Sequence, residues 1–184
     1  CALPISHAEQ VLAALENEWL KADPGAWSVY CNDGFTLVEI LVKAVTGKDY
    51  ATYVQENFFR PLGMTHSAYP IDDFSPTSFA RAYRNGVRQP QEFANGFAMG
   101  GLYTTPSDLA RFARVFLGGG VVDGVRVLTA ASVETMGVNQ VASSFAPVPD
   151  PSSAFGLGWD TVTEPALAAV GVVGGSKNGG IVHY

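Results

Sequence analysis

A phenol and a carboxamide stand two positions apart in Tyr30-Cys31-Asn32, directly before a segment with the apolar pattern of a helix. A phenol can take up and release a proton, and a carboxamide can orient a carbonyl or amide group by hydrogen bonding. The pair therefore predicts part of an acyl-transfer site at the mouth of a helix. Two other interpretations are open, because a tyrosine in this place often only packs its ring and Asn is a common helix N-cap.

The remaining reactive side chains predict neither a metal site nor a cofactor. His7, His66 and His183 are widely separated and have no Glu or Cys at ligand spacing. Cys1 and Cys31 permit one disulfide, which we do not expect, because one is terminal and the other lies inside the motif. We expect Cys31 to be a small buried side chain, with a replacement nucleophile as the alternative.

The composition indicates one globular domain or a large piece of one. The 184 residues are 47% hydrophobic, which is enough for a core, and the net charge is −6 with only 11 Lys and Arg. Nucleic-acid binding needs clustered positive charge, so we expect no such partner. The apolar runs are far shorter than the roughly 20 residues of a membrane-spanning helix, and no signal-peptide pattern opens the chain.

Three helices in quick succession must position Tyr30 and Asn32. An apolar stripe from Ala8 to Trp19 predicts the first, which ends before the turn Asp23-Pro24-Gly25. The second is predicted over Gly34 to Val45 with Gly47 as a left-handed C-cap, and the third over about residues 49–59. We expect five apolar side chains of the second helix to be buried, namely Leu37, Val38, Ile40, Leu41 and Val45.

Residues 69–101 predict a long loop with short extended pieces, because Pro, Asn, Gly and Ser interrupt every apolar run. Its aromatic side chains indicate an ordered loop packed on the body. They are Phe74, Phe79, Tyr83, Phe93 and Phe97. A helix then opens at Thr105-Pro106-Ser107-Asp108 and runs to Leu117, with Thr105 as N-cap and Asp108 reaching back to the free amides.

The last third of the chain predicts mainly β structure. Residues 121–128 have the pattern of a hairpin with a tight turn at Asp123-Gly124, and Thr129 caps a helix to about Met136. Residues 142–153 predict a surface linker. From Phe155 onward, β-branched segments separated by glycines, among them 167–173 and 180–184, predict antiparallel strands.

Five sequence blocks in one order resemble the serine β-lactamase and penicillin-binding-protein-like hydrolases. This family includes class C β-lactamases, D-alanyl-D-alanine carboxypeptidases and related esterases. Each block is weak alone, but five in order cover nearly the whole chain. They are Pro24-Gly25 with Tyr30-Cys31-Asn32, Val45-Thr46-Gly47 with Tyr50, Arg60-Pro61-Leu62-Gly63-Met64, residues 100–109, and Phe155-Gly156-Leu157-Gly158-Trp159 ahead of Lys177-Asn178-Gly179-Gly180.

The resemblance implies an α+β fold of the β-lactamase/transpeptidase type. This chain would supply the helical subdomain and part of an antiparallel sheet, and so an incomplete domain. We expect residues 1–184 to be one partial domain, with a mainly helical subdomain over 6–141 and C-terminal strands over 154–184.

The resemblance also implies a mechanism, in which a serine attacks an acyl carbonyl and forms an acyl-enzyme. Tyr30 would be the base that removes the serine proton. A phenol has a pKa of about 10, so a nearby ammonium such as that of Lys177 must lower the pKa of Tyr30. Asn32 would donate a hydrogen bond to the substrate amide or to the catalytic lysine.

Residues 177–180 look like the Lys-Thr-Gly strand motif of the family, although Asn178 departs from the usual Thr or Ser. By that resemblance Lys177 would attract a substrate carboxylate and the N–H of Gly180 would supply half of an oxyanion hole, with Asn178 and Gly179 in the same substrate-binding segment. The alternative for Lys177 is a solvent-facing edge lysine that discourages strand pairing.

The nucleophile of the family lies in a Ser-x-x-Lys motif, which this sequence does not contain. Three positions before its four lysines stand Glu18, Ile40, Val45 and Gly174. We therefore expect part of a serine hydrolase or acyl-transferase for an amide or ester, inactive alone, and a fragment of a longer product rather than a natural short form. The alternative is a non-catalytic binding or scaffolding relative that lost its nucleophile.

The sequence does not distinguish between lactam, peptide and ester substrates. It does not determine the oligomeric state either. Resemblance to exported relatives favours the periplasm or the cell exterior.

Overall fold

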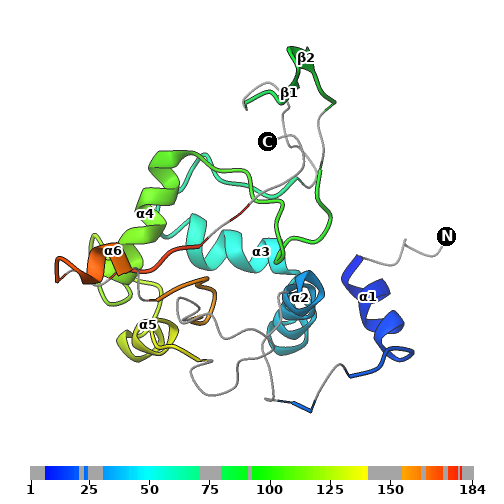
Figure 1. Cartoon of the computed structure of the whole chain (residues 1–184), viewed down its shortest axis with the longest axis horizontal. Coiled ribbons are helices and arrows are strands. Elements are labelled where there is room, and N and C mark those ends of the chain that lie inside the picture. The colour runs from blue at the N-terminus through cyan, green and yellow to red at the C-terminus, as the bar shows by residue number, and fades with distance from the viewer. Residues whose placement is uncertain are drawn as a thin grey trace. The chain divides into compact units, whose positions relative to one another are not determined.

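The computed structural model describes residues 7–20, 23–24, 31–70, 80–90, 93–140, 155–162, 165–171, 174–177 and 179. They belong to two compact units. Figure 1 shows their helices and strands. Unit 1 consists of Cys1–Trp19, Cys31–Arg114 and Val182–Tyr184, and unit 2 of Leu20–Tyr30 and Val115–Ile181.

The first helix, α1, is shorter than predicted. It covers His7–Leu15 and contacts α2, Asn32–Thr46, which lies beside it in Figure 1. Tight turns, in which the amide of Asn17 bonds to Ala14 and that of Glu18 to Leu15, end α1. Trp19 is therefore outside the helix and 91% exposed, so its predicted place on the buried stripe is wrong.

Helix α2 begins two residues before the predicted start and ends at the predicted cap. Gly47 has φ 71°, and its N–H donates to the carbonyl of Lys43 at 2.8 Å, as a left-handed C-cap should. The predicted burial is wrong for three of the five apolar side chains. The fully buried residue is Thr36, with Leu37 and Ile40 half-buried on the same face, whereas Val38, Leu41 and Val45 follow another face and are exposed.

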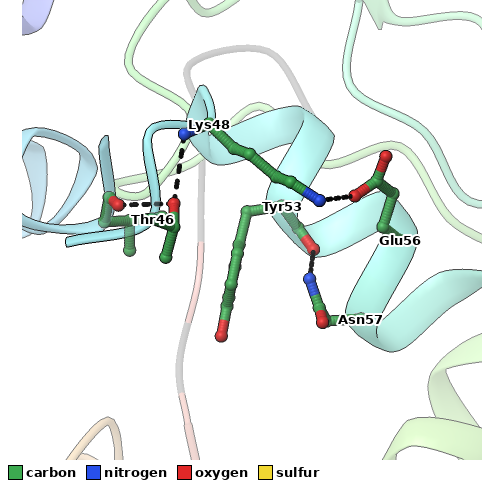
Figure 2. A network of polar contacts seen from close by, with 6 residues as sticks. Thr46, Lys48, Tyr53, Glu56 and Asn57 are labelled. Carbon is green, nitrogen blue, oxygen red and sulfur yellow. Dashed lines mark hydrogen bonds and ion pairs between the residues drawn. The ribbon is translucent and has the colours of Figure 1, made fainter. Parts of the chain in front are cut away.

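The third predicted helix is present as α3, Tyr50–Val54, continued by a π-helical turn η1, Gln55–Phe59. Polar contacts connect the end of α2 to this helix (Figure 2). The hydroxyl of Thr46 donates to the carbonyl of Val42 at 2.7 Å and accepts from the amide of Lys48 at 3.2 Å. Lys48 then forms an ion pair with Glu56 in η1. The segment between α2 and α3 is thus bonded to α2 through Thr46 and to η1 through Lys48.

An aromatic cluster forms the core of unit 1. The ring centroid of Tyr69 lies 5.8 Å from that of Tyr50, 6.0 Å from Phe59 and 5.1 Å from Phe97. Burial raises the pKa of both tyrosine hydroxyls, which share a side-chain hydrogen bond. The backbone N–H of Ala98 donates to Glu39 on α2 at 2.7 Å, so α2 and residues 97–98 are joined.

The predicted packing of the 69–101 loop is confirmed at Phe97, whose ring lies 5.1 Å from that of Tyr69. Phe93 contacts the ring of Tyr103 at 6.3 Å but is itself exposed, so it is not packed into the body as predicted. The prediction is also wrong at Tyr83, which is exposed. Phe74 and Phe79 lie outside the described residues. The ends of the loop meet in a β-bridge, in which Ala68 and Tyr103 exchange two backbone hydrogen bonds of 2.9 Å.

A short hairpin within this loop was not predicted. Strands β1, Tyr83–Arg84, and β2, Val87–Arg88, pair antiparallel. Asn85 at φ 52° and Gly86 at φ 77° form the turn, and both residue types adopt positive φ readily. The Asn-Gly pair was therefore a usable signal for this hairpin.

Helix α4, Pro106–Leu117, opens as predicted, with the amide of Asp108 donating to the hydroxyl of Thr105 at 3.2 Å. The side chain of Asp108 does not reach back to its own helix, which corrects the prediction. It is 3% exposed, and its Oδ2 accepts from the backbone N–H of His66 at 2.8 Å and the hydroxyl of Ser67 at 2.9 Å. The carboxylate thus accepts hydrogen bonds from the segment that follows η1, where the His66 amide has no partner within a helix.

In unit 2 the predicted hairpin and helix are confirmed. Strands β3, Val121–Val122, and β4, Val125–Arg126, pair through a turn with Asp123 at φ 49° and Gly124 at φ 84°. Helix α5, Ala130–Met136, has Thr129 as its N-cap, whose hydroxyl accepts from the amide of Ser132 at 3.0 Å.

The predicted C-terminal strands are wrong over residues 167–171. Pro165–Ala168 form a helical turn, α6, and Gly171 has φ 74°. Proline suits the first helical position, alanine favours helix, and glycine ends it, which outweighs the β-branched residues nearby. Among the described residues after 154, Thr161 and Ser176 pair in an isolated antiparallel β-bridge, and no strand is formed there. The linker 142–153 and residues 180–184 lie outside the described residues.

The C-cap of α2 gives a matched pair of glycine substitutions. Gly47→Ala should lower the free energy of unfolding by about 1 kcal/mol, because φ 71° strains an L-residue although a Cβ would meet nothing within 4 Å. Gly34→Ala, inside the same helix and equally open, should raise it by up to about 1 kcal/mol. Urea unfolding followed by circular dichroism measures both, and shifts of the same sign would contradict this assignment of the cap.

The buried carboxylate of Asp108 predicts a second stability difference. Asp108→Ala should cost about 2–3 kcal/mol of unfolding free energy, because it leaves the His66 amide without its acceptor and removes one of the two hydrogen bonds of the Ser67 hydroxyl, whose other partner is the Thr104 hydroxyl at 2.7 Å. Asp108→Asn keeps one oxygen that can accept both hydrogen bonds and should cost only about 1 kcal/mol. Urea midpoints and slopes give both values, and equal losses would mean that the acceptor is unimportant.

Candidate active site

Asn32, the first residue of α2, stands at the exposed end of that helix. Its N-cap is Cys31, in an extended conformation, and no side chain caps the helix. The interpretation of Asn32 as an N-cap is therefore wrong. The backbone carbonyl of Asn32 accepts from the hydroxyl of Thr36 at 3.4 Å, and the residue is exposed. Tyr30 lies outside the described residues.

The thiol of Cys31 is exposed and reduced, which corrects the expectation of a buried side chain. Cys31 is the N-cap of α2 and makes no side-chain cap hydrogen bond. Cys31 and Asn32 are thus both exposed in unit 1.

Lys177, the second candidate site residue, lies in unit 2 directly after Ser176, which forms a β-bridge with Thr161. Ser176 donates its N–H to Thr161 at 3.0 Å and accepts from the amide of Asp160 at 2.9 Å. The Nζ of Lys177 lies 3.2 Å from Oδ1 and 3.4 Å from Oδ2 of Asp160. Lys177 and Gly179 are exposed, as both interpretations of this lysine require, and Asn178 and Gly180 lie outside the described residues.

The Phe155–Trp159 block lies close to the segment that leads into Lys177. The ring of Trp159 packs edge-on against Phe116, with centroids 4.9 Å apart. A Cβ on Gly175 would lie 2.9 Å from the carbonyl of Thr161 and 3.5 Å from the Trp159 ring. Glycine is therefore required there because the strand segment approaches the block too closely for a side chain.

Asp160 is the residue at this site that sequence analysis missed. The available signal was an acid placed directly after the Phe155–Trp159 block, but only the bridge from Thr161 to Ser176 brings it to Lys177. Asn32 belongs to unit 1 and Lys177 to unit 2, so the structure describes the neighbours of each residue within its own unit. In unit 2, Asp160 forms an ion pair with Lys177.

A serine, a histidine and an aspartate also meet near the start of α4, but they do not form a catalytic triad. In a triad the imidazole lies between the serine and the carboxylate. Here Ser67 bonds directly to Asp108 and is 5% exposed, while Nδ1 of His66 faces the hydroxyl of Thr65 at 3.2 Å. The cluster joins two segments of unit 1 and has no nucleophile open to a substrate.

Within the described ranges no group of three or more His, Cys, Asp or Glu side chains is arranged to hold a metal ion. Over the same ranges no helix has the length and apolar character needed to cross a membrane.

Comparison with known proteins places the chain in a family. A family model described as Beta-lactamase matches residues 3–183. The protein Rv1367c of Mycobacterium tuberculosis is 30% identical over 184 residues, covering 89% of this chain and 45% of the relative. The D-alanyl-D-alanine-carboxypeptidase/endopeptidase AmpH of Escherichia coli is 27% identical over 183 residues, covering 94% of this chain and 44% of AmpH.

A solved structure shares the fold. The octameric penicillin-binding protein homologue from Pyrococcus abyssi matches with a TM-score of 0.67 and 25% identity, over 85% of this chain and 35% of that protein. The predicted α+β fold class is thereby confirmed, and the chain spans less than half the length of the two curated relatives. With a family model matched over residues 3–183, the chain belongs to the Beta-lactamase family.

Proposed function

We propose that this chain is part of a serine hydrolase or acyl-transferase that cleaves an amide or ester through an acyl-enzyme. The observation that carries the proposal is the match to the Beta-lactamase family over residues 3–183. One relative is named as a carboxypeptidase and endopeptidase, and both names describe amide-bond hydrolysis. Amide chemistry is therefore the form of the proposal that the relatives favour.

In this proposal Tyr30 is the general base and Asn32 orients the substrate amide or the catalytic lysine. The place of Asn32 supports its role, because the residue is exposed at the first position of α2. Lys177 supplies an ammonium from an exposed position beside the β-bridge. Asn178, Gly179 and Gly180 would follow along the substrate, with the Gly180 N–H donating to the oxyanion.

The serine nucleophile of the proposed reaction would lie in sequence other than these 184 residues, because none of their four lysines follows a serine at the Ser-x-x-Lys spacing. We therefore propose that residues 1–184 alone form no acyl-enzyme. The same observation supports a second candidate function, that of a non-catalytic binding relative. Cys31 is exposed, so its thiol is chemically accessible as the alternative nucleophile.

The proton-transfer role is tested by Tyr30→Phe in the full-length protein. Turnover of nitrocefin or of a p-nitrophenyl ester should fall by about 100-fold or more in kcat/KM, because the ring is kept while the proton acceptor is lost. Tyr83→Phe, at an exposed site on β1, is the matched control and should stay within about twofold of the wild type.

A Tyr30→Phe rate within about threefold of the wild type would remove Tyr30 from proton transfer. Failure of the full-length wild type to turn over either substrate class, or to be acylated by a fluorescent penicillin, would favour the binding relative.

A further inference from the structure

The strongest feature not used by the proposed mechanism is the carboxylate that faces Lys177. Both oxygens of Asp160 lie within ion-pair reach of its ammonium, at 3.2 and 3.4 Å. The side chain of Asp160 is 28% exposed and that of Lys177 43% exposed. This ion pair is therefore partly shielded from water and is screened less than a fully exposed one.

The backbone rather than two flexible side chains brings this pair together. The amides of Asp160 and Thr161 both donate to the carbonyl of Ser176, at 2.9 and 3.3 Å, and Ser176 returns a bond of 3.0 Å to Thr161. Asp160 and Lys177 each adjoin a residue of this bridge. Their pairing accordingly costs less side-chain entropy than that of an ordinary surface ion pair.

The pairing changes what Lys177 offers to a ligand. A lone ammonium attracts an anionic group, but an ammonium with a carboxylate 3.2 Å away presents little net charge. A substrate carboxylate that approaches Lys177 also meets repulsion from Asp160. An uncharged amide or ester loses nothing, because it can accept a hydrogen bond from the ammonium in either case.

We propose that Asp160 is a specificity-determining residue, which by pairing with Lys177 lowers the preference for substrates that carry a carboxylate beside the scissile bond. The substrates favoured in consequence are uncharged amides and esters. The inference rests on the proposed function, in which Lys177 faces the substrate.

The test compares two substrates that differ only in this charge, an acylated D-alanyl-D-alanine peptide and its C-terminal amide. In the full-length protein, Asp160→Asn should raise the ratio of kcat/KM for the acid over that for the amide by about fivefold, mainly through a lower KM for the acid. The gain should shrink between low and high salt, because it is electrostatic. Asp160→Glu, which keeps the charge, should retain a ratio near that of the wild type.

Glu134→Gln on α5 is the matched control, since it removes the same charge from an exposed helix position. The inference is overturned if Asp160→Asn leaves the ratio within about twofold of the wild type, or if Glu134→Gln raises it equally. Absence of hydrolysis of both substrates by the wild type would instead reject the proposed function, and this inference with it.

Discussion

The buried carboxylate of Asp108 is the interaction on which the described part of unit 1 depends. A carboxylate at 3% exposure is tolerable only when donors satisfy it, and the His66 amide and Ser67 hydroxyl do so. This contact fixes the start of α4 against the residues that follow η1. Two positions later Tyr69 enters the aromatic cluster with Tyr50 on α3, so the contact also sets the core of the unit.

Four signals that act within a few residues were predicted correctly from the sequence, although the equally local Asn85-Gly86 turn was missed. The Gly47 cap, the Thr105 and Thr129 N-caps and the Asp123-Gly124 turn depend on local backbone chemistry, and all four are present. The two donors to Asp108 could not be predicted, since they lie 42 and 41 positions away. Similarly, the apolar pattern of α2 could not show that the face around Thr36, rather than that of Leu41, is buried.

The candidate site shows the same division. The motifs singled out Asn32 and Lys177 as candidates and indicated the family, since a motif is a set of residue types in a fixed order. The match of the family model confirms the family. They could not show that Cys31 is exposed or that Asp160 pairs with Lys177. Those facts depend on helix start and strand pairing, which motif spacing does not determine. The catalytic roles of Tyr30, Asn32 and Lys177 are predictions that rest on the family.

The central proposal is that this chain supplies part of a serine-hydrolase site and that the serine nucleophile belongs to a Ser-x-x-Lys motif outside these 184 residues. The most direct test is to acylate that protein with a fluorescent penicillin or a fluorophosphonate and to identify the modified residue by peptide mass spectrometry. The account predicts an adduct on the serine of a Ser-x-x-Lys motif outside residues 1–184. An adduct on Cys31, or on any serine within these 184 residues, would contradict it.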